Sequence, residues 1–515
     1  MAGTDSSPQA LLLRPGELQL DELRASLTLL AAAAAALTVA PRSVATPRLA
    51  RLDVPRDLKV VSYFPVDAGW TKMWTDWRPD EIDAGLARAA SLHANTVRAI
   101  VQPDLFGYPH PQQPYVARLD AFIQLAAAHG LHVQLTLFDW WYGWEDVAGS
   151  KTWARELLAP YANDPRIAFV ELRNEVLPKP QVTSWLRAML PHVRSVLGGA
   201  TPLTVSVAGR DPARRVARLA RALGGDRPDF WDVHEFGGGA ELMYRSLRRA
   251  AAAVAPVPVW VGETGYPTTT TASGYGGVPL TDSAQEAAQA HFLATAAWAA
   301  RAARLPPIGV WALDDLVPAA VPDHAVSGSD PELHFGLFRV DGTAKPAAGV
   351  ARALFATGRP PTAFNGGFEH TVTTPAGTDV PAEWSMNGDA AFNEDVHTQK
   401  QGRASVRVTL TRPNATASLS ITPPDACARV GRRIVARVWA DRATASGAAA
   451  LVVEWLDARN RVMRRDASRP LAAVHRWQRL RVIARSPRGA AYARIDLVVR
   501  GTSTPVWFDG VSFRR

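Results

Sequence analysis

The stretch Phe169-Val170-Glu171-Leu172-Arg173-Asn174-Glu175 decides the fold of this chain. It is an apolar, partly β-branched run that ends in an Asn-Glu pair, so it predicts a buried strand with a polar carboxyl end. A second segment of the same design, Val257 to Gly265, reads Val-Pro-Val-Trp-Val-Gly-Glu-Thr-Gly. Its glutamate, Glu263, follows Glu175 by about 88 residues, which is roughly four βα units of a barrel.

Short apolar strands alternate with amphipathic helices on both sides of this stretch, from Leu58 onward. The predicted strands are Leu58–Phe64, Thr96–Val101, Leu131–Phe138, Ile167–Asn174, Leu203–Ala208, Phe230–Glu235, Val257–Gly262 and Ile308–Leu313. The helices predicted between them include Pro79–His93, Tyr115–His129, Thr183–Leu197 and Ser283–Arg304. Eight units of strand then helix predict an α/β fold, a (β/α)8 TIM barrel, whose catalytic residues come from the carboxyl ends of the strands.

The character of the sequence changes after the barrel. Gly358-Arg359-Pro360-Pro361 is typical of a linker. Later runs alternate polar and apolar residues without a helical period, which predicts strands at Ala404–Leu410, Ala417–Ile421, Arg433–Trp439, Ala449–Trp455, Trp477–Ala484 and Ala493–Val499. We therefore divide the chain into an N-terminal segment (1–50), the barrel (51–358) and a β-sandwich (359–515).

The N-terminal segment contains an uncharged, alanine-rich run of about 14 residues, Leu27 to Ala40, followed by Pro41-Arg42-Ser43-Val44-Ala45. The run suits the apolar part of a signal peptide and is short for a membrane span. We expect export to the exterior, the periplasm or the cell surface, with the segment either cleaved or kept as a membrane anchor. The acidic residues Glu17, Asp21 and Glu22 leave two alternatives open, a misplaced start codon and a soluble helix.

The composition narrows the function classes. A length of 515 residues, with 47% hydrophobic and 20% charged residues, is typical of a globular protein with more than one domain. The single cysteine, Cys427, excludes an internal disulfide and a cysteine-based metal cage. The net charge of +9 comes mostly from scattered arginines without a continuous run. This pattern favours a solvated basic surface over a nucleic-acid site.

Two carboxylates at strand ends are what the cleavage of a glycosidic bond needs. Asn174-Glu175 together with Gly262-Glu263 resembles the signature of clan-A glycoside hydrolases. The approach to the first strand, Asp164-Pro165-Arg166-Ile167, is most similar to family 5, the cellulase and mannanase type. The resemblance covers residues 55 to 355, the extent of one barrel.

Further positions match this family in the right order. Arg98 matches its buried arginine, His234 its strand-six histidine and Trp311 its sugar-platform tryptophan. The resemblance implies a retaining β-glycosidase, endo-acting on a β-linked glucan or mannan, in which Glu263 attacks the anomeric carbon and Glu175 is the acid and base. Asn174 would then hydrogen-bond the 2-hydroxyl of the reacting sugar. This route needs no metal or organic cofactor and no nucleic-acid partner.

One position departs from the family pattern. A tyrosine is common two residues after the strand-six histidine, but here that position is Phe236. Tyr266 is a candidate substitute, and the chain also remains open to two alternatives. One is a transglycosylase acting on a cell-envelope or exopolysaccharide glycan, and the other is a non-catalytic glycan-binding protein.

Several of these residues also have purely structural interpretations. Arg98 could be a core arginine paired with Glu171, and Glu175 could cap the next helix or pair with Lys179. Aromatic residues follow two strands, as Trp70, Trp74 and Trp77 and as Trp140, Trp141, Tyr142 and Trp144. Such rings form sugar subsites or only pack the loops, and we take Trp140 and Trp141 as substrate-binding. The loop from Thr268 to Gly277 could form a wall or a lid.

The loop after the eighth strand contains six polar residues, Asp314, Asp315, Asp323, His324, Asp330 and His334. Their spacing matches no metal motif, so we expect a solvated loop.

The two ends of the second domain, Asn365–Glu369 and Trp507–Phe513, with Trp384 between them, resemble jelly-roll carbohydrate-binding modules. The resemblance implies that the terminal strands pair and that Glu369 and Asp509 hold a structural calcium. The alternative is a sandwich that only supports the barrel. Glycan binding would require exposed aromatic rings, and Trp439, Trp455 and Trp477 could equally belong to the core.

Overall fold

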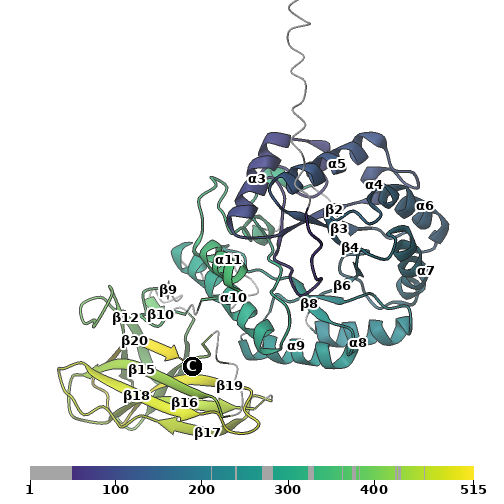
Figure 1. Ribbon diagram of the computed structural model, residues 1–515. Coiled ribbons are helices and arrows are strands. Elements are labelled where there is room, and N and C mark those ends of the chain that lie inside the picture. Colours follow the sequence, from purple (N-terminus) through teal and green to yellow (C-terminus); the bar gives the residue numbers. More distant parts are fainter. Residues whose placement is uncertain are drawn as a thin grey trace, which may run out of the picture. The chain divides into compact units, whose positions relative to one another are not determined.

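The computed structural model contains a parallel α/β barrel and an antiparallel β-sandwich (Figure 1), which confirms the predicted fold class. The described residues are 49–209, 211–237, 240–269, 282–322, 330–361, 364–373, 379–381, 383–423, 426, 431–457 and 459–514. The predicted signal or anchor and Cys427 lie outside them. Within these ranges no helix combines the length and the apolar character that crossing a membrane requires.

The barrel strands follow one another around a ring. They are β1 (Val60–Ser62), β2 (Thr96–Val101), β3 (His132–Leu137), β4 (Ile167–Glu171), β5 (Leu203–Thr204), β6 (Ser206–Val207), β7 (Trp231–His234) and β8 (Val259–Glu263). The predicted strand Leu203–Ala208 is split at Val205 into β5 and β6. Because β5 pairs with β4 and β6 pairs with β7, the chain still continues the ring across this break.

The ring closes where Ile308–Leu313 passes between β8 and β1. We predicted a strand here, but the segment forms only a single parallel bridge, between Val310 and Val61. On its other side the Gly309 N–H donates to the Val261 carbonyl of β8 at 2.8 Å. The segment therefore closes the barrel through individual hydrogen bonds rather than through a regular strand.

Helices surround the strands in Figure 1. They are α2 (Lys72–Thr75), α3 (Pro79–Ser91), α4 (Pro103–Phe106), α5 (Gln113–Ala128), α6 (Val147–Leu158), α7 (Pro180–Val196), α8 (Pro212–Leu223), α9 (Ala240–Val254), α10 (Asp282–Ala302) and α11 (Pro346–Thr357), with 3-10 turns η1 (Ala159–Tyr161), η2 (Pro318–Ala320) and η3 (Asp330–Leu333). Local signals fix where several begin. A proline opens α3, α7, α8 and α11, where a missing N–H costs nothing. Asp146 and Asp211 cap α6 and α8.

The two ends of the barrel interior differ in polarity. An apolar cluster packs around the amino-terminal half of the strands, formed by Leu58, Val60, Ala168, Phe169, Phe230 and Trp260. The carboxyl ends bury polar side chains instead, among them Arg98, Thr136, Glu171, Asp232, His234 and Glu263. Phe169 and Glu171 illustrate the change within β4, since residues two apart share one face of a strand.

The sandwich consists of two five-stranded antiparallel sheets, ordered β11-β14-β19-β16-β17 and β12-β13-β20-β15-β18. Their strands are β11 (Ser385–Gly388), β12 (Ala390–Asp395), β13 (Ser405–Leu410), β14 (Thr416–Ile421), β15 (Arg433–Arg442), β16 (Ala448–Leu456), β17 (Val462–Ala467), β18 (Gln478–Arg485), β19 (Tyr492–Arg500) and β20 (Val506–Arg514). A separate two-stranded sheet contains β9 (Thr371–Thr373) and β10 (Asp379–Pro381). Their inward residues form one apolar core. Each of the six predicted alternating runs is a strand.

The expected pairing of the terminal strands is wrong in its detail. Residues Asn365–Glu369 form no strand, and β9, which follows them, pairs with β10. A hydrogen bond from the Val511 N–H to the Gly366 carbonyl, at 2.7 Å, joins this segment to β20. The two backbones touch so closely that a Cβ at Gly366 would lie 2.3 Å from the Val511 oxygen.

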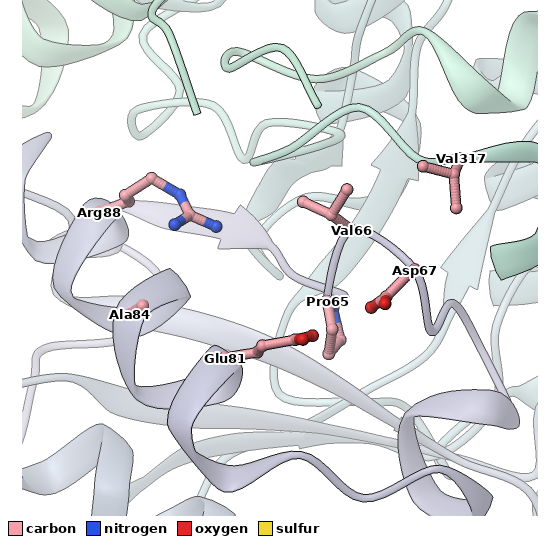
Figure 2. A pocket seen from close by; sticks show the side chains of 7 residues that line it. All are labelled: Pro65, Val66, Asp67, Glu81, Ala84, Arg88 and Val317. Atoms are coloured by element: carbon pink, nitrogen blue, oxygen red, sulfur yellow. The ribbon is translucent and has the colours of Figure 1, made fainter. Parts of the chain in front are cut away.

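A pocket of about 320 Å³ lies between α3 and the loop after β1 (Figure 2). Its lining residues are Pro65, Val66, Asp67, Glu81, Ala84, Arg88 and Val317. Arg88 donates to both oxygens of Asp314, at 3.0 and 2.9 Å, and so ties α3 to the segment after the barrel closure. None of the residues predicted as catalytic or substrate-binding lines this pocket.

Candidate active site

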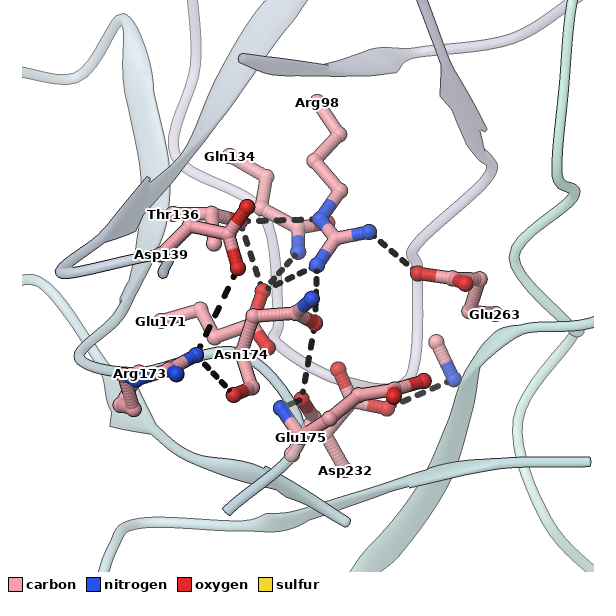
Figure 3. A network of polar contacts seen from close by, with 12 residues as sticks. Arg98, Gln134, Thr136, Asp139, Glu171, Arg173, Asn174, Glu175, Asp232 and Glu263 are labelled. Carbon is pink, nitrogen blue, oxygen red and sulfur yellow. Dashed lines mark hydrogen bonds and ion pairs between the residues drawn. The ribbon is translucent and has the colours of Figure 1, made fainter. Parts of the chain in front are cut away.

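Glu263 is the last residue of β8, and Glu175 follows the end of β4. Both side chains belong to one polar network at the carboxyl ends of the strands (Figure 3). Glu175 has a φ of +47°, a conformation that non-glycine residues rarely adopt. Its N–H donates to Ser206 Oγ at 2.7 Å, which fixes this backbone. Among the described residues its carboxylate hydrogen-bonds His234, rather than Lys179 or the start of α7.

Arg98 on β2 connects the two strands that carry the glutamates. Its guanidinium donates to Glu263, to Glu171 Oε2 at 2.9 Å and to Asn174 Oδ1 at 2.8 Å. Burial acts against the charge of Arg98, but the carboxylates of Glu171 and Glu263 outweigh it and raise the pKa. Arg98 is therefore paired with Glu171 in the core and also contacts Glu263, because its one guanidinium donates to both carboxylates.

Glu171 is the fully buried counter-ion of this network. Its Oε2 accepts hydrogen bonds from Arg98, Thr136 (2.6 Å) and Gln134 (3.1 Å). Burial alone would raise the pKa of Glu171, but the charges of Arg98 and His234 lower it to about 2. Glu171 is thus ionised at every pH of interest and holds Arg98 in place.

His234 at the end of β7 lies between the two glutamates. Its Nδ1 is 2.9 Å from Glu175 Oε1 and 3.4 Å from Glu263 Oε2. One oxygen of Glu175 and one of Glu263 lie within 4.8 Å of each other. Burial lowers the pKa of His234, but the charge of Glu263 and the hydrogen bond with Glu175 raise it to about 10. At neutral pH the imidazolium is therefore a positive charge between two carboxylates.

An irregularity in β8 turns Glu263 into the site. The register between β7 and β8 shifts between Asp232 and His234, so Trp260 and Glu263, three residues apart, both point inward. Gly262 lies directly against Asp232 of β7, and its N–H donates to Asp232 Oδ1 at 2.8 Å. A Cβ at Gly262 would lie 2.3 Å from the Asp232 carboxylate. This close approach is the physical reason for the glycine in the Gly-Glu motif.

The two glutamates differ in exposure and in proton affinity. The side chain of Glu175 is 42% exposed and that of Glu263 only 8%. Burial raises the pKa of Glu263 even though His234 and Arg98 act against it. Burial also acts to raise the pKa of Glu175, but the hydrogen bond and charge of His234 outweigh it and lower that pKa. Before substrate enters, Glu175 is thus the more readily ionised of the two.

Asn174 makes side-chain hydrogen bonds to Arg98, Ser206 and Asp139. Its Oδ1 accepts from Arg98 and from Ser206 Oγ at 3.3 Å, and its amide donates to Asp139. These contacts orient the amide and leave one N–H for a substrate hydroxyl. The predicted role of Asn174 as a ligand for the 2-hydroxyl is compatible with this geometry.

An aromatic cluster borders the network. Trp311 is 8% exposed, and its ring lies 5.9 Å from Phe64, 6.1 Å from Trp70 and 6.0 Å from the Arg98 guanidinium. Trp70 in turn stacks on Trp140 at 6.4 Å. Rings from three separate loops therefore meet beside the charged residues, and Phe64, Trp70 and Trp311 are 5%, 6% and 8% exposed, so they pack mainly on one another.

Two neighbouring aromatic residues pack against other parts of the barrel. Trp141 is 8% exposed and packs against Tyr108 at 4.2 Å and Phe138 at 6.2 Å. Trp74 is fully buried and its indole donates to the Ile100 carbonyl at 2.8 Å. The adjacent residues Trp140 and Trp141 thus differ in environment, and only Trp140 joins the cluster around Trp311.

The position of the absent tyrosine is occupied by packing. Phe236 lies edge-to-face with Phe335 at 5.9 Å. The ring of Tyr266 lies 5.7 Å from Phe292. The group that contacts both glutamates directly is His234.

Glu332 on η3 is a further carboxyl group beside the site, and no sequence motif pointed to it. It accepts a hydrogen bond from the Trp311 side chain, and burial followed by the charge of Glu263 raises its pKa to about 7. It lies in a 3-10 turn without strand or helix periodicity, so no pattern distinguished it from the other acidic residues of its loop.

The expectation that the loop after the eighth strand is solvated is wrong for two of its residues. The Asp314 side chain is 0% exposed and pairs with Arg88. Asp315 is buried and accepts from Lys345 Nζ and from the Gly336 N–H, both at 2.8 Å. Both aspartates anchor the segment that closes the barrel, which explains their burial. Asp323 and His324 lie outside the described residues, as does most of Thr268–Gly277.

The pair predicted to hold calcium, Glu369 and Asp509, converges on one loop of the sandwich. Asp509 Oδ2 accepts the N–H groups of Lys400 (2.7 Å) and Gln401 (2.8 Å), and both oxygens of Glu369 accept that of Arg403 (3.0 Å). Asp509 Oδ1 is buried and has no partner among the described residues. Asp509 Oδ1 is therefore suited to bind a cation. The other carboxylate oxygens of Asp509 and Glu369 already accept backbone N–H groups of the loop, so a calcium ion at this site stays a prediction.

Comparisons with known proteins find similarity at the level of structure. No protein-family model and no curated protein matches the chain. The exo-β-1,4-mannosidase Op5Man5 from Opitutaceae bacterium strain TAV5 matches at 22% identity over 60% of this chain and 61% of that one, with a TM-score of 0.47. A GH5_18 protein from Streptomyces cattleya, solved with GlcNAc, matches at 20% identity over 60% and 83%, also at 0.47.

A third match extends over both domains. It is a family 39 glycoside hydrolase from Bacteroides cellulosilyticus WH2, at 14% identity over 88% of this chain and 82% of that one, with a TM-score of 0.43. The chain spans less than two thirds of Op5Man5.

Proposed function

We propose that the barrel is a retaining β-glycosidase in which Glu263 is the nucleophile and Glu175 the acid and base. The observation that carries this proposal is the spacing of the two carboxylates, whose nearest oxygens lie within 4.8 Å. Retaining enzymes hold their carboxyl groups about 5 to 5.5 Å apart, whereas inverting enzymes need about 6.5 to 9.5 Å to admit a water molecule.

The chemistry proceeds in two displacements. Glu263 attacks the anomeric carbon while Glu175 gives its proton to the glycosidic oxygen, so one C–O bond forms as another breaks. Water then attacks the glycosyl ester, Glu175 takes a proton from it, and Glu263 leaves as a carboxylate. Arg98 and His234 stabilise that carboxylate before the first step and as it departs in the second.

The proton must be on Glu175 when the first step begins. In the free site His234 lowers the pKa of Glu175, which is the opposite direction. A sugar bound over Glu175 covers its 42% exposed side chain, and the loss of water raises the pKa of a carboxyl group. Substrate binding thus supplies the shift that the acid needs, and esterification of Glu263 later removes a negative charge and lets Glu175 act as a base.

We propose a β-linked polysaccharide, a glucan or a mannan, as the substrate and endo action as its mode. The partly exposed ring of Trp140, which stacks on Trp70 beside the catalytic pair, supports this, because a partly exposed indole can stack on a sugar ring. Glu332, hydrogen-bonded to the Trp311 side chain, would accept hydrogen bonds from hydroxyl groups of a sugar bound there.

The test is the release of reducing ends from mannan, glucomannan, carboxymethylcellulose, mixed-linkage glucan, laminarin and xylan, with products sized. Release from one polymer, with the β-anomer formed first, is the expected result. Glu263→Gly should lose this activity and regain turnover of an activated β-glycoside with azide, giving the inverted glycosyl azide. Formation of the α-anomer first by the wild type would contradict the retaining mechanism.

A further inference from the structure

The outer face of the sheet β12-β13-β20-β15-β18 concentrates positive charge. Burial alternates along β15 and β18, so every second residue points away from the core. The outward residues are Arg433, Val435, Arg437 and Trp439 on β15 and Arg479, Arg481, Ile483 and Arg485 on β18. Arg514 of β20 pairs with Val435 and extends the same face. We call Arg433, Arg437, Arg479, Arg481, Arg485 and Arg514 the arginine face.

Like charges oppose each other directly on this face. The register pairs Arg433 with Arg485 and Arg437 with Arg481. Facing cations destabilise a sheet. Partial burial and the charges of neighbouring arginines lower the pKa of Arg437. Among the described residues no carboxylate forms an ion pair with the arginine face, and the ion pair of Arg407 with Asp395, at 4.0 Å, lies at the opposite edge of the sheet.

A tryptophan holds two cations at one end of the face. Arg479 lies 4.6 Å and Lys400 4.9 Å from the ring of Trp439. Cation–π contacts of this kind restrict the side chains to one place without neutralising them. The charge is therefore positioned as well as concentrated, and Trp439 belongs to this surface, whereas Trp455 is part of the core.

Protection of a sheet edge does not account for the arrangement. Charged residues on an edge strand prevent pairing with other chains, and β18 is an edge strand. However, Arg433 and Arg437 lie on β15 and Arg514 on β20, which are both interior strands. A polyanion bound to this face would offset the repulsion within the sheet.

We propose that the arginine face binds an acidic polysaccharide that carries a carboxylate on its sugar units. Guanidinium groups bind carboxylates through two parallel hydrogen bonds, and a polymer that repeats the charge engages several arginines at once. The choice of a glycan among polyanions rests on the proposed glycosidase activity of the barrel. The arginine face would then keep an anionic polymer, or an anionic region of the substrate, attached to the enzyme.

The test is binding of the full-length protein to polygalacturonate, measured by affinity electrophoresis at several salt concentrations, with neutral mannan as the reference. Arg437→Gln/Arg481→Gln removes one facing pair. It should weaken polygalacturonate binding about tenfold, without lowering the melting temperature, because a repulsion is removed. The control Arg459→Gln/Arg500→Gln removes the same charge from two exposed positions outside this sheet, in the turn after β16 and at the end of β19, and should bind as the wild type does.

Each other outcome overturns the proposal. Absence of binding, equal binding of mannan, or an equal loss in the control variant would exclude an acidic-glycan site. Equally tight binding of duplex DNA, or of vesicles containing anionic lipid, would exclude a glycan as the particular ligand. Polygalacturonate binding is also measured with the Glu263→Gln variant. Binding to the arginine face needs no turnover, so failure of this proposal is distinguishable from failure of the proposed catalytic activity.

Discussion

The two ends of the barrel strands use the same scaffold for opposite purposes. At the amino-terminal end Phe169, Phe230 and Trp260 pack edge-to-face, with ring centroids 5.2 to 6.1 Å apart. At the carboxyl end the interior buries the cationic side chains of Arg98, Arg173 and His234 among several carboxyl groups. Apolar burial stabilises the fold, whereas buried charge costs desolvation and is compensated only by accurate pairing. The strands thus separate stability from chemistry along their length, as TIM barrels do.

The strongest way to test this separation is Glu263→Gln. We expect kcat/KM to fall by about a thousandfold or more, since the nucleophile is lost, whereas the melting temperature stays within a few degrees. Arg98 keeps Glu171 and Asn174 as partners, so its charge remains compensated. Kinetics and thermal unfolding of the same preparation measure both quantities. Turnover near that of the wild type would refute the nucleophile assignment.

Trp260→Ala is the converse change. Trp260 is 0% exposed and its indole donates to the Pro307 carbonyl at 2.7 Å. Truncation should lower the free energy of unfolding by about 3 to 5 kcal/mol. Below the melting temperature kcat should change little. Denaturant unfolding gives the first quantity, and initial rates at low temperature give the second. A large fall in kcat with unchanged stability would show that the two ends are not separate.

Sequence patterns predicted most strands because each is a local run of apolar, β-branched residues. Thr96–Val101 was predicted to the residue. The exceptions depend on neighbours that are distant in sequence. Val205 interrupts a strand at the change of sheet, and Ile308–Leu313 meets β8 and β1 only where the ring closes. No window of residues contains that information.

The candidate site divides in the same way. Arg98, Asn174, Glu175, His234 and Glu263 follow from motifs at strand ends, and the fold brings them together (Figure 3). The burial of individual side chains around these motifs could not be predicted from the sequence, since it depends on how distant loops pack against one another.

The same limit applies to the residues around these motifs. Trp140 and Trp141 are adjacent and identical, yet they have different neighbours. Asp314 was expected in solvent and is buried, and Glu332 had no local signature.

Glu332→Gln should make stability less dependent on pH. Burial raises the pKa of Glu332 to about 7, above the 4.5 of an unfolded chain. The folded state keeps a proton that the unfolded state has lost, so this stabilisation is complete below pH 4.5 and is lost as pH rises through 7. The wild type should therefore lose about 2 to 3 kcal/mol relative to Glu332→Gln between these values. Parallel urea titrations across this range measure it, and parallel curves would contradict the raised pKa.

Trp140→Ala should give the smallest effect of these substitutions. It tests whether this ring at the carboxyl end of the barrel contributes to substrate binding or only to packing. Its ring stacks on Trp70 beside Trp311, so its loss should raise KM for the polymer several-fold, in line with about 1 kcal/mol for an aromatic contact. Turnover of a short aryl glycoside, which does not reach that ring, should be unchanged. Tyr142→Ala removes a neighbouring ring that is 71% exposed and should leave both constants as they are. If Trp140→Ala instead lowers the melting temperature with KM unchanged, Trp140 supports the fold as Trp141 does, and the sugar-binding surface is limited to Trp311 and Trp70.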